Sequence, residues 1–179
     1  MNIENEITVL NVNKQQLITS LKNAGAKQIT EELKQVRYVY DFKPKNENKW
    51  IRLRSNGQKT TLAIKEVTNS SKLNTKEYEV EVSDIETTNE ILEQLGYTYR
   101  NRQENLRQIF ELDGAEISID SWPMIPPYVE IEAKDLQSIN KVVEKLGLDK
   151  NNITTLDVCS IYKNIYNIDI LEITDLKFE

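Results

Sequence analysis

The chain has 179 residues, 39% hydrophobic and 29% charged, which suits one domain with a substantial core. Its 29 acidic and 23 basic side chains give a net charge of -6, which argues against a general surface for nucleic acid or anionic membrane. The sequence has no histidine and one cysteine, Cys159, so Ser-His nucleophile activation, imidazole ligands and an intrachain disulfide are excluded. Acid, base and metal-binding roles therefore fall mainly to carboxylates.

No apolar run approaches the roughly 20 residues that a membrane-spanning helix needs. The first residues are polar and do not form a basic and apolar leader. The lone cysteine agrees with a reducing compartment. We therefore expect a soluble cytoplasmic protein, with residues 1–179 as a single domain. The sequence does not reveal the oligomeric state, so a homodimer stays open.

The first expected strand, residues 3–10, shows a pattern that recurs along the chain. Strand side chains alternate between two faces, so Glu4, Glu6 and Thr8 share one face and the opposite face is apolar. A helical pattern follows and ends at a glycine. The sequence predicts a half-polar strand followed by an amphipathic helix.

This strand and helix unit occurs three times. Each copy has two alternating glutamates, an Asn or Asp suited to the helix N-cap, and a glycine suited to the left-handed stop. In chain order these residues are Glu4, Glu6, Asn13 and Gly25, then Glu79, Glu81, Asp84 and Gly96, then Glu130, Glu132, Asp135 and Gly147. We infer an imperfect internal repeat.

Further strands are expected between these units. They cover residues 36–43, 49–55, 60–66, 98–112 and 115–121. Asn56-Gly57 and Asp113-Gly114 are strong hairpin signals, residues 69–75 are expected to form a loop, and a short helix is expected around residues 160–166. The resulting fold class is α+β, an eight-stranded antiparallel β-barrel, or tunnel, with helices packed on its outside.

The strand charges predict what this barrel contains. Residues 51–54 alternate Ile, Arg, Leu, Arg, and several other strands alternate in the same way. If the helices cover the outside, the apolar strand faces must point outward and the ionic faces must line the interior. The alternative is an open sheet whose charges face water. The paired R-x-R and E-x-E patterns favour a polar tunnel.

A polar tunnel would hold more carboxylates than cations. The expected acidic residues are Glu4, Glu6, Glu79, Glu81, Asp120, Glu130 and Glu132, and the basic residues are Arg52, Arg54, Lys65 and Arg107. Like charges 4 Å apart repel by about 4 kcal/mol at an effective dielectric near 20. Oxygen ligands suit Mg2+ or Mn2+, and guanidinium groups suit phosphate oxygens. A metal-bound chain of phosphates is the expected ligand.

These motifs resemble the CYTH superfamily, which comprises class IV adenylyl cyclases and triphosphate tunnel metalloenzymes. The resemblance rests on E-x-E at Glu4 and Glu6, Tyr40-Asp41, I-R-L-R at 51–54, T-L-A-I-K ending at Lys65, E-Y-E-V-E-V at 77–82, Arg107, I-S-I-D ending at Asp120, and Y-V-E-I-E at 128–132. It covers nearly the whole chain. It implies an eight-stranded antiparallel tunnel with a polar interior.

The resemblance also implies roles for individual residues. Glu4, Glu6, Glu130 and Glu132 look like ligands of Mg2+ or Mn2+. Arg52, Arg54, Lys65 and Arg107 look like the triphosphate clamp. Glu79 and Glu81 look like tunnel residues that orient the basic groups or help to bind the metal. Asp120 or Glu132 would accept a proton. The family's signature is E-x-E-x-K, and Thr8 stands at the lysine position, where its hydroxyl could bind phosphate without adding charge.

The leading hypothesis is a metal-dependent enzyme that acts on a triphosphate, either ATP or tripolyphosphate. The first form is a class IV adenylyl cyclase-like enzyme that makes cyclic AMP and pyrophosphate. The second form is a tripolyphosphatase or organic triphosphatase. Because Thr8 brings no charge, a non-catalytic binder of triphosphate or another polyanion is a competing hypothesis. A structural domain with an empty tunnel is a further alternative.

Overall fold

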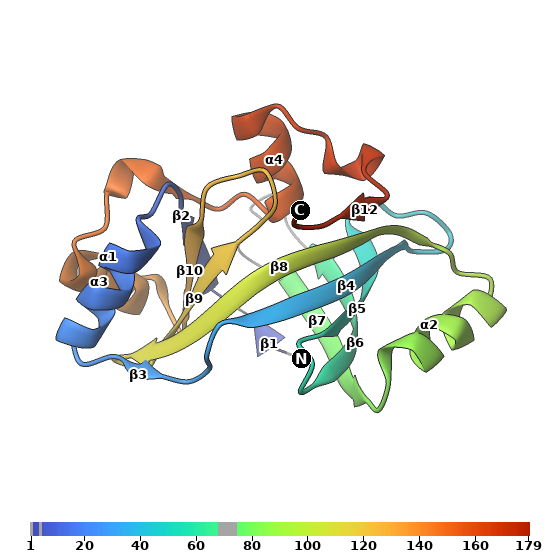
Figure 1. Ribbon diagram of the computed structural model, residues 1–179, viewed down its shortest axis with the longest axis horizontal. Coiled ribbons are helices and arrows are strands. Elements are labelled where there is room, and N and C mark those ends of the chain that lie inside the picture. Colours follow the sequence, from blue (N-terminus) through green and yellow to red (C-terminus); the bar gives the residue numbers. More distant parts are fainter. Residues whose placement is uncertain (1, 4, 68–74) are drawn as a thin grey trace.

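A computed structural model describes the chain from residue 2 to residue 179, except residues 4 and 68–74. It shows an α+β fold in which a curved, mainly antiparallel sheet carries most of its helices on its outer side (Figure 1). Eight strands form the body of the sheet: β2 (Asn5–Val9), β4 (Leu33–Asp41), β5 (Lys49–Ser55), β6 (Thr60–Val67), β7 (Thr75–Val82), β8 (Tyr99–Leu112), β9 (Ala115–Ser121) and β10 (Tyr128–Ala133). The predicted fold class is confirmed.

Shorter elements complete the described part of the chain. The helices are α1 (Lys14–Asn23), α2 (Ile85–Gln94), α3 (Leu136–Leu146) and α4 (Val158–Tyr166), with 3-10 turns η1 (Lys150–Asn152) and η2 (Ile170–Glu172). Short strands are β1 (Asn2–Ile3), β3 (Lys27–Gln28), β11 (Ile153–Thr154) and β12 (Asp175–Leu176). In this described part, no helix has both the length and the apolar character required to cross a membrane.

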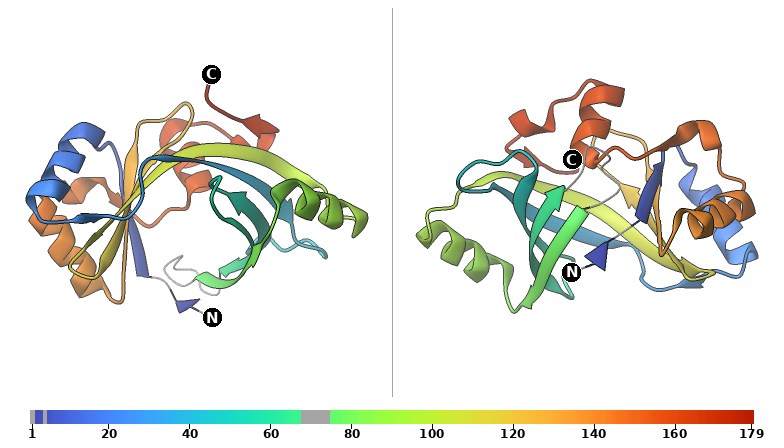
Figure 2. Two further views of the ribbon diagram at one scale, coloured as in Figure 1. Left: turned by 60° about the horizontal axis from the view of Figure 1, so that its bottom comes forward. Right: turned by 180° about the vertical axis from the view of Figure 1, so that it is seen from behind.

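The strand order explains how the sheet becomes a tunnel. The eight long strands run β7-β6-β5-β4-β8-β9-β10-β2, and β1 pairs with the free side of β7. The N-terminal stretch therefore reaches both ends of this path, with β1 on β7 and β2 on β10. Figure 2 shows the sheet curling around the space between these ends. Hydrogen bonds between neighbouring strands run along the whole path from β1 and β7 to β2. The sheet therefore forms a tunnel, although it is not a strictly closed barrel.

Most expected strand boundaries agree with the structure to within one residue, β5 and β9 agree at both ends, and the strand expected at 36–43 ends at Asp41. Strand β4 begins at Leu33, three residues earlier than the apolar pattern predicts, because its polar start pairs with β8 from Leu33 opposite Arg107. Backbone pairing does not require apolar side chains. The expected loop at 69–75 lies outside the described residues except for Thr75, which begins β7.

The apolar faces of the strands point outward, as the alternation predicted. Helices α1 and α3 cover β2, β9 and β10, where Leu21 is fully buried among residues such as Ile117 and Ile131. Helix α2 covers β5, and Leu92 packs near Leu53. The polar faces are consequently left on the inner side of the curve.

The predicted helix ends are correct where the sequence placed them. Asn13, Asp84 and Asp135 each accept a backbone hydrogen bond within the first turn. Gly147 ends α3 in the left-handed conformation, at φ 64°. Helix α4 begins two residues before the predicted start, because Asp157 caps it and accepts from the Ser160 N–H at 2.8 Å.

Replacing Leu21 with alanine is expected to lower the free energy of unfolding by about 2–5 kcal/mol, because the methyl groups leave a cavity under α1. Chemical denaturation monitored by circular dichroism measures the loss. Leu95→Ala is the matched control, since Leu95 is 69% exposed on the outer side. Equal losses for both variants would contradict the assigned core.

Candidate functional site

The inner face of the curved sheet encloses a cavity of about 840 Å3. Its walls come from the ionic faces of the strands, with the residues before and at the start of α4 along one side. The predicted site residues that line it are Glu6, Thr8, Arg52, Arg54, Lys65, Glu79, Arg107, Glu130 and Glu132. These residues come from six strands, β2, β5, β6, β7, β8 and β10, and converge on one polar tunnel.

Of the predicted site residues that the structure describes, Glu81 and Asp120 do not line this cavity. Glu4 lies outside the described residues. Glu81 lies near the end of β7, with its side chain 66% exposed and 3.4 Å from Lys59, outside the wall of this cavity. Asp120 is 0% exposed and is absent from the cavity wall, because Arg107 bonds to it from the inner side. The alternation of side chains along a strand shows which face a residue occupies, but not how far along the tunnel it lies.

The cations of β5 and β6 are held by glutamates of the neighbouring strand β7. The Arg52 guanidinium lies 2.7 Å from a Glu77 oxygen and 3.2 Å from a Glu79 oxygen. Lys65 lies 3.1 Å from Glu77, and Arg54 lies 3.7 Å from Glu79. Burial opposes ionisation of Glu77, but Arg52 and Lys65 lower its pKa below the usual value. These glutamates fix the direction of the basic groups.

Glu77 orients the basic groups together with Glu79, a role that the sequence analysis gave to Glu79 and Glu81. It belongs to the same E-x-E-x-E run on β7 and shares its face with Glu79. The register places Glu77 opposite Lys65 and Glu81 opposite Thr61. Choosing between the three glutamates requires knowledge of this pairing register, which the alternation alone does not contain.

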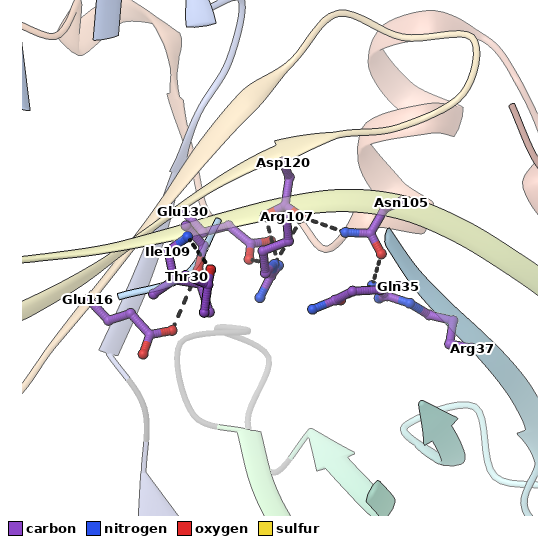
Figure 3. Close-up of polar contacts among 10 residues, drawn as sticks. Thr30, Gln35, Arg37, Asn105, Arg107, Ile109, Glu116, Asp120 and Glu130 are labelled. Atoms are coloured by element: carbon purple, nitrogen blue, oxygen red, sulfur yellow. Dashed lines mark hydrogen bonds and ion pairs between the residues drawn. The ribbon is translucent and has the colours of Figure 1, made fainter. Parts of the chain in front are cut away.

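Arg107 joins the two carboxylates on its side of the tunnel. Its guanidinium lies 2.8 Å from Asp120 and also contacts Glu130, and Asn105 donates to Asp120 at 2.7 Å (Figure 3). Burial raises the pKa of Asp120 to about 6, although Arg107 opposes the shift. Asp120 is therefore a support for Arg107, shielded from the cavity.

Carboxylates gather on the part of the wall formed by β2 and β10. Glu6 lies directly opposite Glu132 in the strand register, and Glu130 lies opposite Thr8. Repulsion from Glu130, followed by burial, raises the pKa of Glu6 to about 8. The positive charge near these carboxylates does not neutralise them. A bound divalent cation would reduce the repulsion between them. In the part of the chain that the structure describes, no three ligating side chains converge closely enough to hold a metal as they stand.

Replacing Glu6 with glutamine is expected to stabilise the metal-free protein at pH 8 by about 1–4 kcal/mol, at about 1.4 kcal/mol per pKa unit. The native state retains the Glu6 proton up to about pH 8, whereas the unfolded state releases it near the ordinary glutamate pKa of 4.5. The free energy of unfolding of the wild type should therefore fall as the pH rises between these two values. That of the variant should fall less.

Denaturant unfolding at pH 5 and pH 8, with a chelator present, tests this expectation. Glu111→Gln is the control, because Glu111 is exposed on β8. The same pH dependence in wild type and Glu6→Gln would show that the repulsion at Glu6 is absent.

Arg37 is a site residue that the sequence analysis missed. It is 7% exposed, lies on β4 and lines the cavity. The available signal was the alternation on β4, where Arg37 and Gln35 share one face and Val36 and Tyr38 share the other. The aromatic and β-branched residues of this segment predict a strand, and Arg37 lies on its polar face, which contributes no other predicted site residue.

One mouth of the cavity carries apolar side chains next to the charged ones. Val39 and Trp50 line it from β4 and β5, and Leu156 and Val158 line it from the segment around the start of α4. An apolar or aromatic group can pack on such side chains while a charged tail extends into the tunnel. The cavity is therefore suited to an anion that bears an organic group.

Comparison with solved structures supports the fold. A conserved hypothetical protein from Pyrococcus furiosus has TM-score 0.75 and 20% identity, covering 87% of this chain and 97% of that chain. A candidate adenylate cyclase from Vibrio parahaemolyticus has TM-score 0.74 and 14% identity, covering 93% and 99%. A Hippeastrum protein, named as an adenylyl cyclase candidate with a dominant triphosphatase activity, has TM-score 0.62 and 12% identity, covering 96% and 99%.

These identities establish similarity of fold alone. No curated protein matches the sequence significantly. The sequence does match the CYTH domain over residues 2–173, nearly its full length. The tunnel, its inner R-x-R and E-x-E faces and this match lead to one conclusion: the chain belongs to the CYTH domain family.

Proposed function

We propose that this protein binds a triphosphate-containing small molecule together with Mg2+ or Mn2+ and converts it chemically, with residues 1–179 acting as a single domain. The observation that carries the proposal is the division of the cavity wall. Arg52, Lys65 and Arg107 face the tunnel from three strands, and the carboxylates of β2 and β10 line another side. Guanidinium and ammonium groups bind phosphate oxygens, and carboxylates bind hard divalent ions.

Glu6, Glu130 and Glu132 would hold the metal, with Glu4, which lies outside the described residues, as a further ligand. The chemistry of these donors fits Mg2+ or Mn2+, because all are carboxylate oxygens. The neighbouring Glu130 also disfavours the charged form of Glu6, which a bound cation would stabilise. When bound, the metal supplies positive charge that offsets the charge developing on the phosphates.

In the cyclase form, Arg52, Arg54 and Lys65 hold the triphosphate in line for attack. The 3′-hydroxyl oxygen bonds to the α-phosphorus, the bond from this phosphorus to the bridging oxygen breaks, and pyrophosphate leaves with that bond's electrons. Glu132, on the cavity wall, accepts the hydroxyl proton. Catalysis comes mainly from positioning and charge stabilisation. Asp120 acts through Arg107 as a positioning residue, since it does not reach the cavity.

The apolar mouth favours ATP over a triphosphate without an organic group, because Val39 and Trp50 can pack against a base. Cyclic AMP formation is therefore the first reaction to test. Hydrolysis is the second candidate, because the Hippeastrum protein of similar fold is named for a dominant triphosphatase activity. In this hydrolase form, a water oxygen bonds to phosphorus, the phosphoanhydride bond breaks, and the water proton passes to a tunnel carboxylate.

Thr8 motivates the alternative of a non-catalytic binder of triphosphate. It is 3% exposed and lies opposite Glu130 on the inner face. Its hydroxyl can donate to a phosphate oxygen, but it cannot neutralise charge. This alternative would be supported if the wild-type protein binds a triphosphate without forming product and the Thr8→Lys variant forms product.

The test incubates the purified protein with Mn2+ or Mg2+ and, separately, with ATP and tripolyphosphate. Cyclic AMP, pyrophosphate and orthophosphate are then resolved. Cyclic AMP with pyrophosphate, lost in Glu130→Gln and retained in Glu111→Gln, supports the cyclase form. Orthophosphate alone supports the hydrolase. If neither ligand reacts or raises the melting temperature, the proposed function is wrong.

A further inference from the structure

Arg37 differs from the other arginines of the tunnel in the groups that hold it. Its guanidinium donates to the Gln35 side-chain oxygen at 3.1 Å and to the Asn105 side-chain oxygen, and it stacks on Trp122 with its carbon 4.6 Å from the ring centroid. Figure 3 shows Arg37 near Gln35 and Asn105. All three partners are neutral. Among the described residues, the buried Arg37 Nε has no acceptor.

The other cations described on this wall are matched with carboxylates. Arg52 contacts Glu77 and Glu79, and Arg107 contacts Asp120 and Glu130. No ion pair of Arg37 is found among the described residues. A buried cation held in a fixed direction by neutral groups, and lining a cavity, is suited to an anionic ligand.

The strand register adds a second observation. Arg37 lies directly opposite Arg54 in the β4–β5 pair, and both line the cavity. Like charges directly opposite on one face of a sheet destabilise it. The nearest carboxylate of Arg54 is Glu79 at 3.7 Å, which also contacts Arg52. Burial, and then the neighbouring guanidinium groups, lower the pKa of Arg37 to about 10 and that of Arg54 to about 9.

The register also gives the depth of this arginine pair. Asp41 lies opposite Trp50 near the apolar mouth, Val39 lies opposite Arg52, and Arg37 lies opposite Arg54. Successive residues on one face of a strand are about 7 Å apart. A ligand whose organic group packs on Trp50 therefore meets Arg52 first and the Arg37–Arg54 pair last.

We propose that Arg37 and Arg54 form a separate subsite for the terminal phosphoryl group of the substrate, and that this subsite selects triphosphates over diphosphates. The inference rests on the proposed function, because it assigns one phosphate of the same ligand. A terminal phosphoryl dianion matches the two opposed guanidinium groups in charge. A diphosphate held by Arg52 and Lys65 is too short to reach the subsite. Arg54 belongs to the I-R-L-R motif of the family resemblance, and Arg37 is the residue that the subsite adds to it.

Titration calorimetry with tripolyphosphate and pyrophosphate, in the presence of Mg2+, tests the subsite. Arg37→Met is expected to weaken tripolyphosphate binding by about 10- to 100-fold, the range for losing a hydrogen bond to a charged group. Pyrophosphate binding should change by less than about threefold, so the preference for tripolyphosphate should collapse. Arg54→Met should show the same selective loss. Lys145→Met is the control, since Lys145 pairs with Asp113 outside the cavity.

The melting temperature without ligand separates this role from a structural one. Methionine removes a buried cation opposite Arg54, so Arg37→Met should melt at the wild-type temperature or above it. Arg37→Lys retains a charge and should recover part of the preference for tripolyphosphate. A lower melting temperature or failure to fold would assign Arg37 to structure and overturn the proposal.

The binding data also separate this inference from the proposed function. If wild type binds both ligands and Arg37→Met binds them equally well, or loses both to the same extent, only the subsite is wrong. If wild type binds neither tripolyphosphate nor ATP, the subsite and the proposed function are both wrong.

Discussion

Arg52→Met is expected to lower kcat/KM for the triphosphate substrate by about 10²- to 10³-fold, the range for losing one preorganised charge-stabilising group. Arg52 lies on the cavity wall, its side chain is 11% exposed, and Glu77 and Glu79 fix its direction. Because it is already oriented, it can stabilise charge on the phosphates without reorganising. Steady-state rates with ATP and with tripolyphosphate measure the effect.

Arg102→Met is the matched control for this experiment. Arg102 also contacts two carboxylates, Glu104 at 2.8 Å and Asp175 at 2.9 Å. Unlike Arg52, it does not line the cavity. Its replacement should leave turnover unchanged at temperatures where the protein stays folded. Equal losses of activity in the two variants would show that Arg52 acts through stability and does not contact the substrate.

Arg107→Met is expected to lower the free energy of unfolding by about 3–5 kcal/mol, the cost of removing one partner of a buried ion pair. Asp120 is 0% exposed, and without Arg107 it would keep Asn105 as a hydrogen-bond donor but lose its paired charge. Chemical denaturation at pH 7 measures the loss. Arg102→Met should cost less, because the partly exposed Arg102 pair is screened by solvent.

The Arg107–Asp120 pair can be isolated by a double-mutant cycle. Asp120→Asn in the Arg107→Met background removes the stranded charge and retains a hydrogen-bonding group. It should recover a large part of the lost stability. Strictly additive losses would mean that Asp120 does not depend on Arg107, and its interpretation as a positioning residue would fail.

Much of the fold follows from local sequence patterns. The alternation at 51–54 gave the inner and outer faces of β5, and Asn56-Gly57 marked the following turn. Asp135 and Gly147 defined the ends of α3. These features depend on neighbouring residues and on fixed periods, so a single sequence contains them.

The composition of the site was only partly predictable. Arg52 and Lys65 were found because they share the ionic face of their strands. Glu81 and Asp120 share such faces too, but one lies at an exposed strand end and the other lies behind Arg107. Depth along the tunnel and cover by another side chain are properties of three-dimensional packing, which a two-residue period cannot express.

The sequence by itself determined the α+β class, the polar inner face and the set of charges that the tunnel could hold. Only the tertiary structure decided which charges meet. Strand register placed Arg37 opposite Arg54, Glu6 opposite Glu132 and Glu77 opposite Lys65. Pairing between strands is set by long-range closure of the sheet, and a shift of one residue would exchange every inner and outer side chain.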